Sequence, residues 1–477
     1  MNKRTEIARL LAEPPLGEVV TVNGWVRAFR SRRFIALNDG SSFHNLQVVV
    51  DFEQLDDTLL KRISFHACLR VTGKLVASQG AGQAVEVIAQ ELEILGDSDP
   101  EAYPLQPKKQ TMAFLRENAH FRMRTQTLSS VFRIRHALAF AIHQYFHERG
   151  FYYLHSPIIT GSDAEGAGEM FRVTTLDVGQ PPRTEAGDID WSADFFGKST
   201  NLTVSGQLQA EIGALALGKV YTFGPTFRAE NSNTTRHLAE FWMIEPEVAF
   251  ADIHDNMDLA EDFVKYLIRF VLEHYSDDME FLDRRIQERE KNMKKEERRP
   301  MGLLDTLHFV LEHDFERITY TEAVAQLQRS KPYKKGKFQF PVEWGSDLQA
   351  EHERWLVEKH FKKPVIVRDY PAGIKAFYMR LNEDEKTVAA MDVLFPGIGE
   401  VIGGSQREER LDVLQKRMAG MNVPEEELDW YLDLRRFGGN AHAGFGLGFE
   451  RMIQFVTGII NIRDVAPFPR APGSAEF

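Results

Sequence analysis

The first hundred residues alternate between apolar and polar positions with the period of a β-strand. The alternation is clearest at residues 19–26, 46–50, 69–76 and 85–88. An Asn38-Asp39-Gly40 turn follows the first run, and such punctuated short runs predict about five strands. Strands of this length in a segment this small predict a barrel such as an OB-fold, whose outer face commonly binds single-stranded nucleic acid. We assign residues 1–98 to this domain.

A segment rich in proline and charge, residues 99–120, follows and predicts a linker. Beyond it, apolar side chains recur at helical spacing from Val131 to Tyr145, which predicts a helix that ends at Gly150. A protein core or an oligomer interface would explain this stripe equally well.

The pattern changes twice more before the C-terminus. Residues 252–275 have helical periodicity, and strand-like runs return from residue 363 onward. Between them, the segment around 276–300 is dense in charges of both signs. Mixed signs favour a solvated helix or an insertion over an arm that binds nucleic acid.

Composition excludes several classes of protein. Hydrophobic residues make up 43% of the 477 residues and charged residues 27%, which is typical of a globular protein with full cores. The net charge of −12 argues against nonspecific coating of nucleic acid, although residues 1–36 carry seven Lys/Arg against three Glu. A single cysteine, Cys68, fits a reducing cytoplasm. No run of about 18 apolar residues occurs, so we expect no membrane span.

The most informative stretch runs from Thr226 to Glu247. Arg228 and Glu230 lie two residues apart, and a strand would place both side chains on one face. A guanidinium suits a phosphate because its planar fork offers paired donors and keeps its charge. The neighbouring acid can accept from the amino group of a base or substrate. Taken alone, the pair is equally explained by a surface ion pair.

Three later segments offer complementary chemistry. Asp392 and Glu400 stand on strand-like runs either side of a turn, where two carboxylates can share a hydrated Mg²⁺ that bridges substrate phosphates. Arg407 follows a pair of glycines and can hold a small carboxylate or amide. The glycine-rich stretch 444–448 precedes Arg451, which can reach a phosphate. No Walker loop is present, and the glycine pattern alone is a weak signal.

Two polar stretches complete the set of candidates. Residues 162–171, with Glu165 among them, are small and polar, as in a mobile lid or an ordinary glycine-rich turn. Ser205 and Gln207 open a predicted helix near the positive end of its dipole, where a plain helix cap explains Ser205 as well.

Together these segments resemble the signature motifs of class II aminoacyl-tRNA synthetases, in the aspartyl, asparaginyl and lysyl subgroup. The predicted helix with Pro157 resembles motif 1, residues 227–230 motif 2 and residues 446–451 motif 3. Within the subgroup the chain resembles the asparaginyl family over nearly its whole length. The most specific stretches for that resemblance are 227–247, 397–408 and 461–470.

The resemblance implies an α+β fold, with the N-terminal OB-fold barrel as anticodon reader and residues 121–477 as a catalytic domain whose antiparallel sheet is flanked by helices. It implies a homodimer built on motif 1. It also implies that ATP, Mg²⁺ and L-asparagine give asparaginyl-adenylate, and that the asparaginyl group passes to the 3′-hydroxyl of tRNA(Asn). Catalysis then requires positioned reactants and charge neutralisation rather than an enzymic nucleophile.

Matching positions carry the family's residue roles onto this chain. The nucleotide would be bound by Arg228, Glu230, His237, Phe241, Glu400, Gly448 and Arg451, of which Arg228, Glu400 and Arg451 are catalytic. The amino acid would be bound by Glu165, Ser205, Gln207, Glu245 and Arg407, and the metal by Asp392 and Glu400. In the barrel, Phe34, Gln47 and Glu86 would contact the anticodon, although Phe34 is equally explained as core.

The substrate's identity depends on a missing charge. Aspartyl relatives carry a lysine where this chain has Ala210, and without that lysine a buried substrate carboxylate would lack a partner. A carboxamide needs one donor and one acceptor, which Arg407 and a nearby glutamate can supply; Glu211, Glu240 and Glu245 are candidates. The alternatives are an aspartyl enzyme, including a nondiscriminating one, and a paralogue that makes asparagine or only binds tRNA.

The chain departs from the family pattern just before motif 3. It has Ala441 and Ala443 either side of His442, where relatives usually have proline before the histidine. This departure leaves the contact of His442 open.

Overall fold

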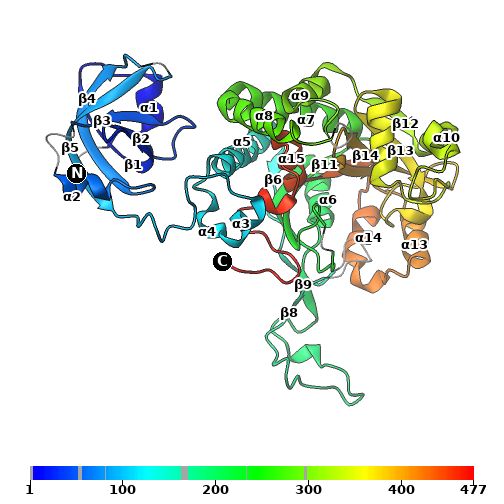
Figure 1. The fold of residues 1–477 in the computed structure, drawn as a ribbon. Helices are drawn as coiled ribbons and strands as arrows, with labels where there is room; N and C mark the ends of the chain where they lie inside the picture. The colour runs from blue at the N-terminus through cyan, green and yellow to red at the C-terminus, as the bar shows by residue number, and fades with distance from the viewer. Residues whose placement is uncertain (1–3, 52–55, 81, 163–169, 233, 295–297) are drawn as a thin grey trace. The chain divides into compact units, whose positions relative to one another are not determined.

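The computed structural model describes residues 4–51, 56–80, 82–162, 170–232, 234–294 and 298–477. The chain divides into two compact units, Met1–Ser130 and Val131–Phe477, each drawn in Figure 1. Within the described ranges, no helix combines the length and the apolar character needed to cross a membrane. The predicted domain boundaries at 1–98, 99–120 and 121–477 stay predictions.

The N-terminal unit is built on a closed barrel of strand order β1-β2-β3-β5-β4. The strands are β1 (Val19–Arg30), β2 (Phe34–Asn38), β3 (Leu46–Val49), β4 (Cys68–Ala77) and β5 (Val85–Gly96). Their inward apolar side chains form one core, and the helix α1 (Ile7–Ala12) adds Ile7 and Leu10 to it. The alternating pattern therefore predicted the barrel because one face of each strand is buried.

One glycine permits the tight curvature of the barrel. The pairing of β4 with β5 shifts register between Thr72 and Gly73. A Cβ atom at Gly73 would lie 2.2 Å from the carbonyl oxygen of Ile88, so no larger residue fits there. The unit also contains α2 (Asp57–Arg62), α3 (Met112–Glu117) and α4 (Ala119–Arg122).

The second unit is built on an eight-stranded sheet of order β12-β13-β14-β15-β16-β11-β10-β6. The strands are β6 (Tyr152–Tyr153), β10 (Lys219–Phe227), β11 (Glu240–Ala249), β12 (Glu316–Thr319), β13 (Val365–Pro371), β14 (Thr387–Phe395), β15 (Gly399–Gln406) and β16 (His442–Gly448). The pairs β12–β13 and β10–β6 are parallel and the others antiparallel. The predicted antiparallel sheet is confirmed for the run β13-β14-β15-β16-β11-β10, and the short strands β12 and β6 add a parallel pair at each edge.

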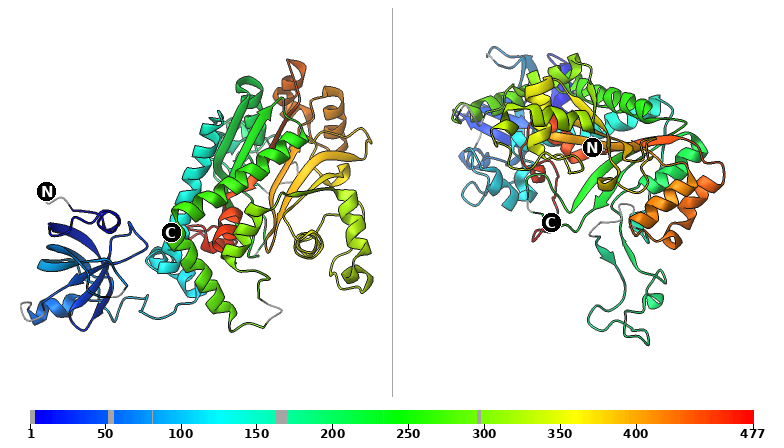
Figure 2. Two further views of the ribbon diagram at one scale, coloured as in Figure 1. Left: turned by 90° about the horizontal axis from the view of Figure 1, so that it is seen from above. Right: turned by 90° about the vertical axis from the view of Figure 1, so that its right-hand side faces the viewer.

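Helices cover this sheet, as Figure 2 shows from two directions. The longer ones are α5 (Gln126–Glu148), α6 (Gln207–Leu217), α7 (Ile253–His274), α8 (Ser276–Glu290), α9 (Leu303–Glu312), α10 (Tyr320–Arg329), α13 (Leu411–Gly420), α14 (Asp429–Arg436) and α15 (Phe449–Thr457). The shorter helices are α11 (Lys331–Lys334) and α12 (Ala350–Trp355). A separate three-stranded sheet joins β7 (Ile159–Thr160), β9 (Thr200–Leu202) and β8 (Arg172–Val173).

The predicted helical stripe is confirmed as core. The side chains of the stripe on α5, from Val131 through Ile134, Leu138 and Ile142 to Tyr145, are buried within the chain itself, against α7 among others. Helix α7 begins at a capping box formed by Asp252 and Asp255, which satisfies the first amide groups of the helix.

The charged segment after α7 differs from the expectation of a solvated insertion. One face of α8 is buried through Met279, Leu282 and Ile286. At its start, Asp278 forms an ion pair with Arg133 of α5 at 2.7 Å. A solvated segment was expected because charged residues dominate its composition. A few apolar residues at helical spacing nevertheless pack one face of α8 against the rest of the unit.

Candidate active site

Two adjoining pockets lie over the middle of the eight-stranded sheet. The first is lined by residues that include Arg228, Glu230, Arg236, His237, Phe241, Gly448 and Arg451. The second is lined by residues that include Ser205, Gln207, Glu245, Lys375, Tyr378, Asp392 and Arg407. Arg228, Met243, Glu400 and Gly446 line both pockets. Predicted residues from segments far apart in the sequence therefore meet in one place.

The backbone around Arg228 and Glu230 corrects one prediction. Strand β10 ends at Phe227, so the two residues lie in the connection beyond it rather than on one strand face. The Arg228 amide still donates to the Ala239 carbonyl at 3.0 Å, which continues the hairpin by one bond. Both side chains nevertheless line the first pocket.

Aromatic and basic groups form the wall of the first pocket. The guanidinium carbon of Arg228 lies 5.4 Å from the centre of the Phe241 ring. The Nδ1 atom of His237 lies 2.6 Å from the hydroxyl of Thr234, which fixes the ring. Burial lowers the pKa of His237; Glu230 raises it and the nearby arginines lower it, and the net shift is downward. The ring is therefore neutral at neutral pH.

Arg451, in the segment that resembles motif 3, supplies a further cation to the first pocket. The Arg451 Nη1 atom, on α15, donates to the carbonyl oxygen of Glu400 at 3.2 Å and lies 3.7 Å from its carboxylate. About a third of the Arg451 side chain stays exposed, at 32%. It therefore faces the first pocket with its charge only partly matched by the protein.

The predicted metal ligands lie side by side on adjacent strands. A Cβ atom at Gly403 would lie 3.4 Å from a Glu400 oxygen and 3.5 Å from an Asp392 oxygen, so both carboxylates flank this glycine. Asp392 also accepts from the Nζ atom of Lys375 at 2.9 Å. Sequence reasoning missed Lys375, which lies on a connection without periodicity.

A third carboxylate, Glu353 of α12, adjoins the pair. It accepts from the Glu400 amide at 3.2 Å. Burial, and after it the neighbouring Glu400 and Asp392 carboxylates, raise the pKa of Glu353 to about 7, while the Glu400 amide and Arg236 lower it by less. Across the described ranges, no group of three or more His, Cys, Asp or Glu side chains is arranged to hold a metal ion by itself. The local surplus of negative charge nonetheless suits a cation.

Arg407 is paired inside the protein as well as facing the second pocket. Its guanidinium forms a two-point ion pair with Glu247, in which Nε donates at 3.2 Å, and Nη1 donates to the Ser405 hydroxyl at 2.8 Å. Both partners of the ion pair are fully buried. The glutamate beside Arg407 is thus Glu247, which sequence reasoning did not select although it shares a strand face with Glu245.

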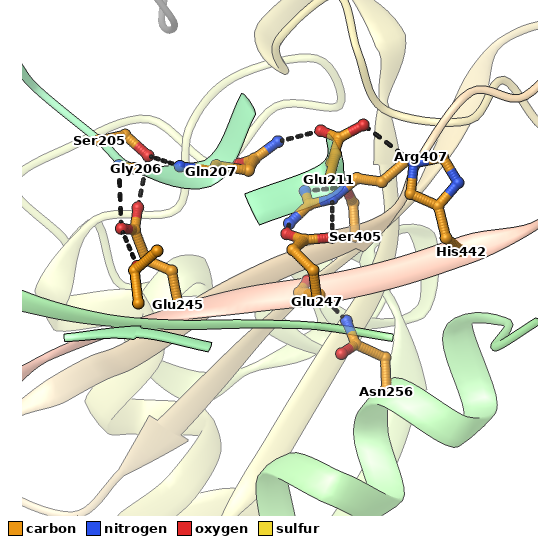
Figure 3. A network of polar contacts seen from close by, with 12 residues as sticks. Ser205, Gly206, Gln207, Glu211, Glu245, Glu247, Asn256, Ser405, Arg407 and His442 are labelled. Carbon is orange, nitrogen blue, oxygen red and sulfur yellow. Dashed lines mark hydrogen bonds and ion pairs between the residues drawn. The ribbon is translucent and has the colours of Figure 1, made fainter. Parts of the chain in front are cut away.

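The other acid of β11, Glu245, holds the start of α6 (Figure 3). The Ser205 hydroxyl donates to it, the Gly206 amide donates to it at 2.9 Å, and the Thr222 hydroxyl at 2.8 Å. The Ser205 hydroxyl also accepts from the backbone N–H of Gln207 at 3.1 Å. The N-cap position of α6 is Gly206, so Ser205 precedes the cap, and it lines the second pocket.

Glu211 and His442 lie together beneath the second pocket. The Nε2 atom of His442 lies 2.9 Å from Glu211, and its Nδ1 atom 2.8 Å from the carbonyl oxygen of Asn440. These contacts fix the ring despite the two flanking alanines. The third candidate, Glu240, is exposed at the start of β11.

Two further predictions concern the pocket's surroundings. Ala210 is fully buried in a small cluster with Ala214 and Val220 rather than among the described pocket-lining residues. Glu165, the predicted lid residue, lies outside the described residues.

The predicted nucleic-acid residues of the barrel lie on its outer face. Phe34 is half-buried and does not belong to the core, so its interpretation as core is wrong. The guanidinium carbon of Arg33 lies 5.7 Å from the centre of its ring. On adjacent strands, the Gln47 amide donates to Glu86 at 2.8 Å. The alternation of β2 and β3 places these side chains outward.

Two family descriptions match the chain. Residues 111–472 match the class II tRNA synthetases of the D, K and N group, and residues 20–95 match an OB-fold nucleic acid binding domain. The asparagine–tRNA ligase of Cytophaga hutchinsonii is 56% identical over 480 residues, covering 100% of both chains. That of Porphyromonas gingivalis is also 56% identical, covering 100% of this chain and 99% of its own.

A solved structure agrees with these matches. The asparaginyl-tRNA synthetase of Pyrococcus horikoshii, complexed with asparaginyl-adenylate, superimposes with a TM-score of 0.84 at 31% identity and covers 100% of both chains. The likeness therefore extends over the barrel, the sheet and both pockets. The chain belongs to the asparagine–tRNA ligase family of class II aminoacyl-tRNA synthetases.

Proposed function

We propose that this chain joins L-asparagine to tRNA(Asn) in two steps, with ATP consumed in the first. The observation that carries the proposal is the pair of pockets that share Arg228, Met243, Glu400 and Gly446. One pocket is basic and has an aromatic wall, as a nucleotide requires. The other is lined by polar groups that are already paired, as a small neutral side chain requires. Their junction is where the two substrates react.

In the first step, a carboxylate oxygen of asparagine attacks the α-phosphorus of ATP in line. The bond from that phosphorus to the bridging oxygen breaks, diphosphate leaves and asparaginyl-adenylate forms. The chain supplies position and charge rather than a nucleophile. Arg228 holds the α-phosphate at the junction, and Arg451 and His237 hold the outer phosphates.

The base occupies the aromatic end of the first pocket. Phe241 stacks on the adenine, and Glu230 accepts from its amino group. The backbone at Gly448 leaves room for the ligand, since a Cβ atom there would meet only Arg451 atoms, none closer than 3.7 Å. Magnesium, when bound at Asp392 and Glu400, would neutralise phosphate charge, with water and phosphate completing its oxygen ligands. The charge surplus around Glu353 supports that placement.

The amino acid occupies the second pocket. The Arg407 guanidinium has N–H groups beyond those that bind Glu247 and Ser405, so it can donate to the carboxamide oxygen. Gln207, Ser205 and Glu245 line the same pocket and face the substrate's N–H groups. Glu165, outside the described residues, stays a predicted contact of the amino acid. Ala210 lies behind this pocket on the same helix as Gln207 and brings no positive charge near it, which favours asparagine over aspartate.

In the second step, the 3′-hydroxyl of the tRNA attacks the activated carbonyl and AMP leaves. We assign anticodon contact to the outer face of the barrel, where Phe34 stacks on a base and Gln47 and Glu86 offer hydrogen bonds. Stacking on one base contributes roughly 1–3 kcal/mol.

We further propose a homodimer in the cytoplasm. Strand β6 lies at the edge of the sheet, and its Tyr152 and Tyr153 are more than half exposed, as is Phe140 of α5. Exposed aromatics at a strand edge are typical of an interface. The molecular mass in solution tests this assignment.

The proposed activity is tested by ATP–diphosphate exchange with asparagine, followed by charging of tRNA(Asn). Exchange that depends on asparagine and charging that depends on tRNA(Asn) are the expected results. Exchange with neither asparagine nor aspartate would show that the chain only binds tRNA.

A further inference from the structure

Four donors converge on the buried carboxylate of Glu211, beneath the amino-acid pocket. Its oxygens lie 3.1 Å from Gln207 Nε2, 2.8 Å from the Tyr431 hydroxyl, 2.9 Å from Arg435 Nη2 and 2.9 Å from His442 Nε2. Figure 3 shows Gln207 and His442 approaching this carboxylate from two sides. Glu211 and Arg435 are both fully buried at their side chains. The carboxylate is therefore held by donors from α6, α14 and β16.

This arrangement fixes which way the Gln207 amide faces. An ionised carboxylate only accepts hydrogen bonds, so the NH₂ end of Gln207 must face Glu211. Burial raises the pKa of Glu211, whereas the charge of Arg435 and then the hydrogen bond from His442 lower it. The lowering effects are larger together, so the net shift of the pKa is downward. Glu211 therefore stays ionised, and the carbonyl oxygen of Gln207 is left to accept from a ligand in the amino-acid pocket.

Two of the four donors come from one helix that does not line the pocket. Tyr431 and Arg435 lie one turn apart on α14, and the Arg435 Nη2 atom also lies 2.9 Å from the Tyr431 hydroxyl. The Arg435 Nε atom donates to the carbonyl oxygen of Glu408 at 2.9 Å. Helix α14 thus ties Glu211 to the backbone that follows Arg407.

We propose that Tyr431 and Arg435 are positioning residues for asparagine recognition, acting through Glu211 to present the carbonyl oxygen of Gln207 to the N–H groups of the substrate. Neither residue touches the substrate. Loss of either loosens Glu211, so the Gln207 amide can rotate and present its NH₂ end instead. Binding of asparagine weakens while binding of ATP in the adjoining pocket does not. This inference rests on the proposed activity of the amino-acid pocket.

The test uses ATP–diphosphate exchange by the full chain, with KM measured separately for asparagine and for ATP. The variants are Tyr431→Phe, which keeps the ring, and Arg435→Lys, which keeps the charge but loses the planar fork. We expect each to raise KM for asparagine about 10-fold, the size of one hydrogen bond to a charged group. KM for ATP should change less than about 2-fold, because neither substitution contacts the nucleotide pocket and changes away from a site usually have effects of this size.

Glu211→Gln tests the central carboxylate itself. A neutral amide can donate as well as accept, so it no longer determines the orientation of the Gln207 side-chain amide. It should raise KM for asparagine at least as much as Tyr431→Phe does. Arg436→Lys is the matched control, since Arg436 is the next residue of α14 and, among the residues that the structure describes, its guanidinium pairs with the exposed Asp429 and Asp433 rather than with Glu211. It should leave both KM values unchanged.

Three outcomes would overturn the inference. They are an unchanged KM for asparagine in Tyr431→Phe, equal increases in both KM values, and loss of kcat alone in variants with wild-type thermal unfolding. Any of these would show that Tyr431 and Arg435 do not position Gln207 for asparagine recognition. A wild-type chain that shows no asparagine-dependent exchange would instead contradict the proposed activity, so the two failures are distinguishable.

Discussion

The two pockets share lining residues, but they differ in how completely their arginines are buried and paired with carboxylates of the protein. In the nucleotide pocket Arg451 is 32% exposed and reaches the Glu400 carboxylate only at 3.7 Å. In the amino-acid pocket Arg407 is 3% exposed and is joined to Glu247 by a two-point ion pair. Glu211 and Arg435 form a second buried pair beneath it.

This difference follows from what each pocket must bind. Phosphates bring charge that a partly matched arginine can neutralise, so binding improves the electrostatics of the nucleotide pocket. The amino-acid pocket is already balanced, so an additional buried carboxylate would remain uncompensated, whereas a neutral carboxamide exchanges hydrogen bonds without that cost. Discrimination against aspartate therefore comes from charges that the protein has paired beforehand.

Removing the cation at the junction should have the largest effect. Arg228→Ala deletes the guanidinium that we propose faces the α-phosphorus, and we expect exchange to fall about 1000-fold or more. The proposed homodimer and the thermal unfolding should stay as in the wild type, as sedimentation and calorimetry can check. A variant that is unfolded or monomeric would show that Arg228 is structural.

Removing the cation of the amino-acid pocket should damage folding as well as activity. Arg407→Met leaves Glu247 buried without its partner, which costs about 3–5 kcal/mol of unfolding free energy. The double variant Arg407→Met/Glu247→Leu should recover most of that stability but not the activation of asparagine. Denaturant unfolding and exchange measured on both variants check this pattern. A single variant as stable as the double one would contradict the claim that the pocket's charges are balanced in advance.

A substitution at the shared wall should affect both pockets. A Cβ atom in Gly446→Ala would lie 2.6 Å from Met243 Cε, so that side chain must shift, and it lines both pockets. We expect KM for ATP and for asparagine to rise together, by about 3- to 10-fold, as overpacking costs of about 1 kcal/mol imply. Gly224→Ala is the control, because a Cβ atom there meets nothing within 4 Å. An increase in only one KM would show that the pockets are separate.

The smallest expected effect is a difference between the two pockets in how KM depends on pH. His237, whose pKa is lowered, is neutral in the free enzyme at neutral pH. Bound phosphates favour its charged form, so ATP binding takes up a proton and KM for ATP should fall as pH falls from about 8 to about 6.5, by roughly 2- to 3-fold. KM for asparagine should stay flat over that range, and His237→Asn should remove the slope. An unaltered slope in that variant would assign the effect to another group.

Local patterns predicted the elements and the polar residues that adjoin a motif. The barrel followed from alternation, α5 from its apolar stripe, and Arg228, Glu400 and Arg451 from short polar signatures. Arg228 was placed on a strand because its pattern continues that of β10, but the polar residues after Phe227 turn the chain into a connection. The edge pairs β6–β10 and β12–β13 were missed because strands of two or four residues carry too little periodicity.

Long-range pairs could not be predicted. Glu247 and Arg407 are 160 positions apart, and Glu211 and Arg435 are 224 positions apart. No local spacing relates such residues, and only the register of β11, β15 and β16 and the packing of α14 bring them together. Glu353 and Lys375 were missed for the same reason, since each contributes one charge from a segment without a motif.

The central claim is that the amino-acid pocket is charge-balanced before its substrate arrives. The most direct test compares kcat/KM of the wild-type chain in ATP–diphosphate exchange with asparagine and with aspartate at saturating ATP. We predict a ratio of at least about 1000 in favour of asparagine, as buried polar recognition without editing allows. Exchange with aspartate as fast as with asparagine would contradict the account.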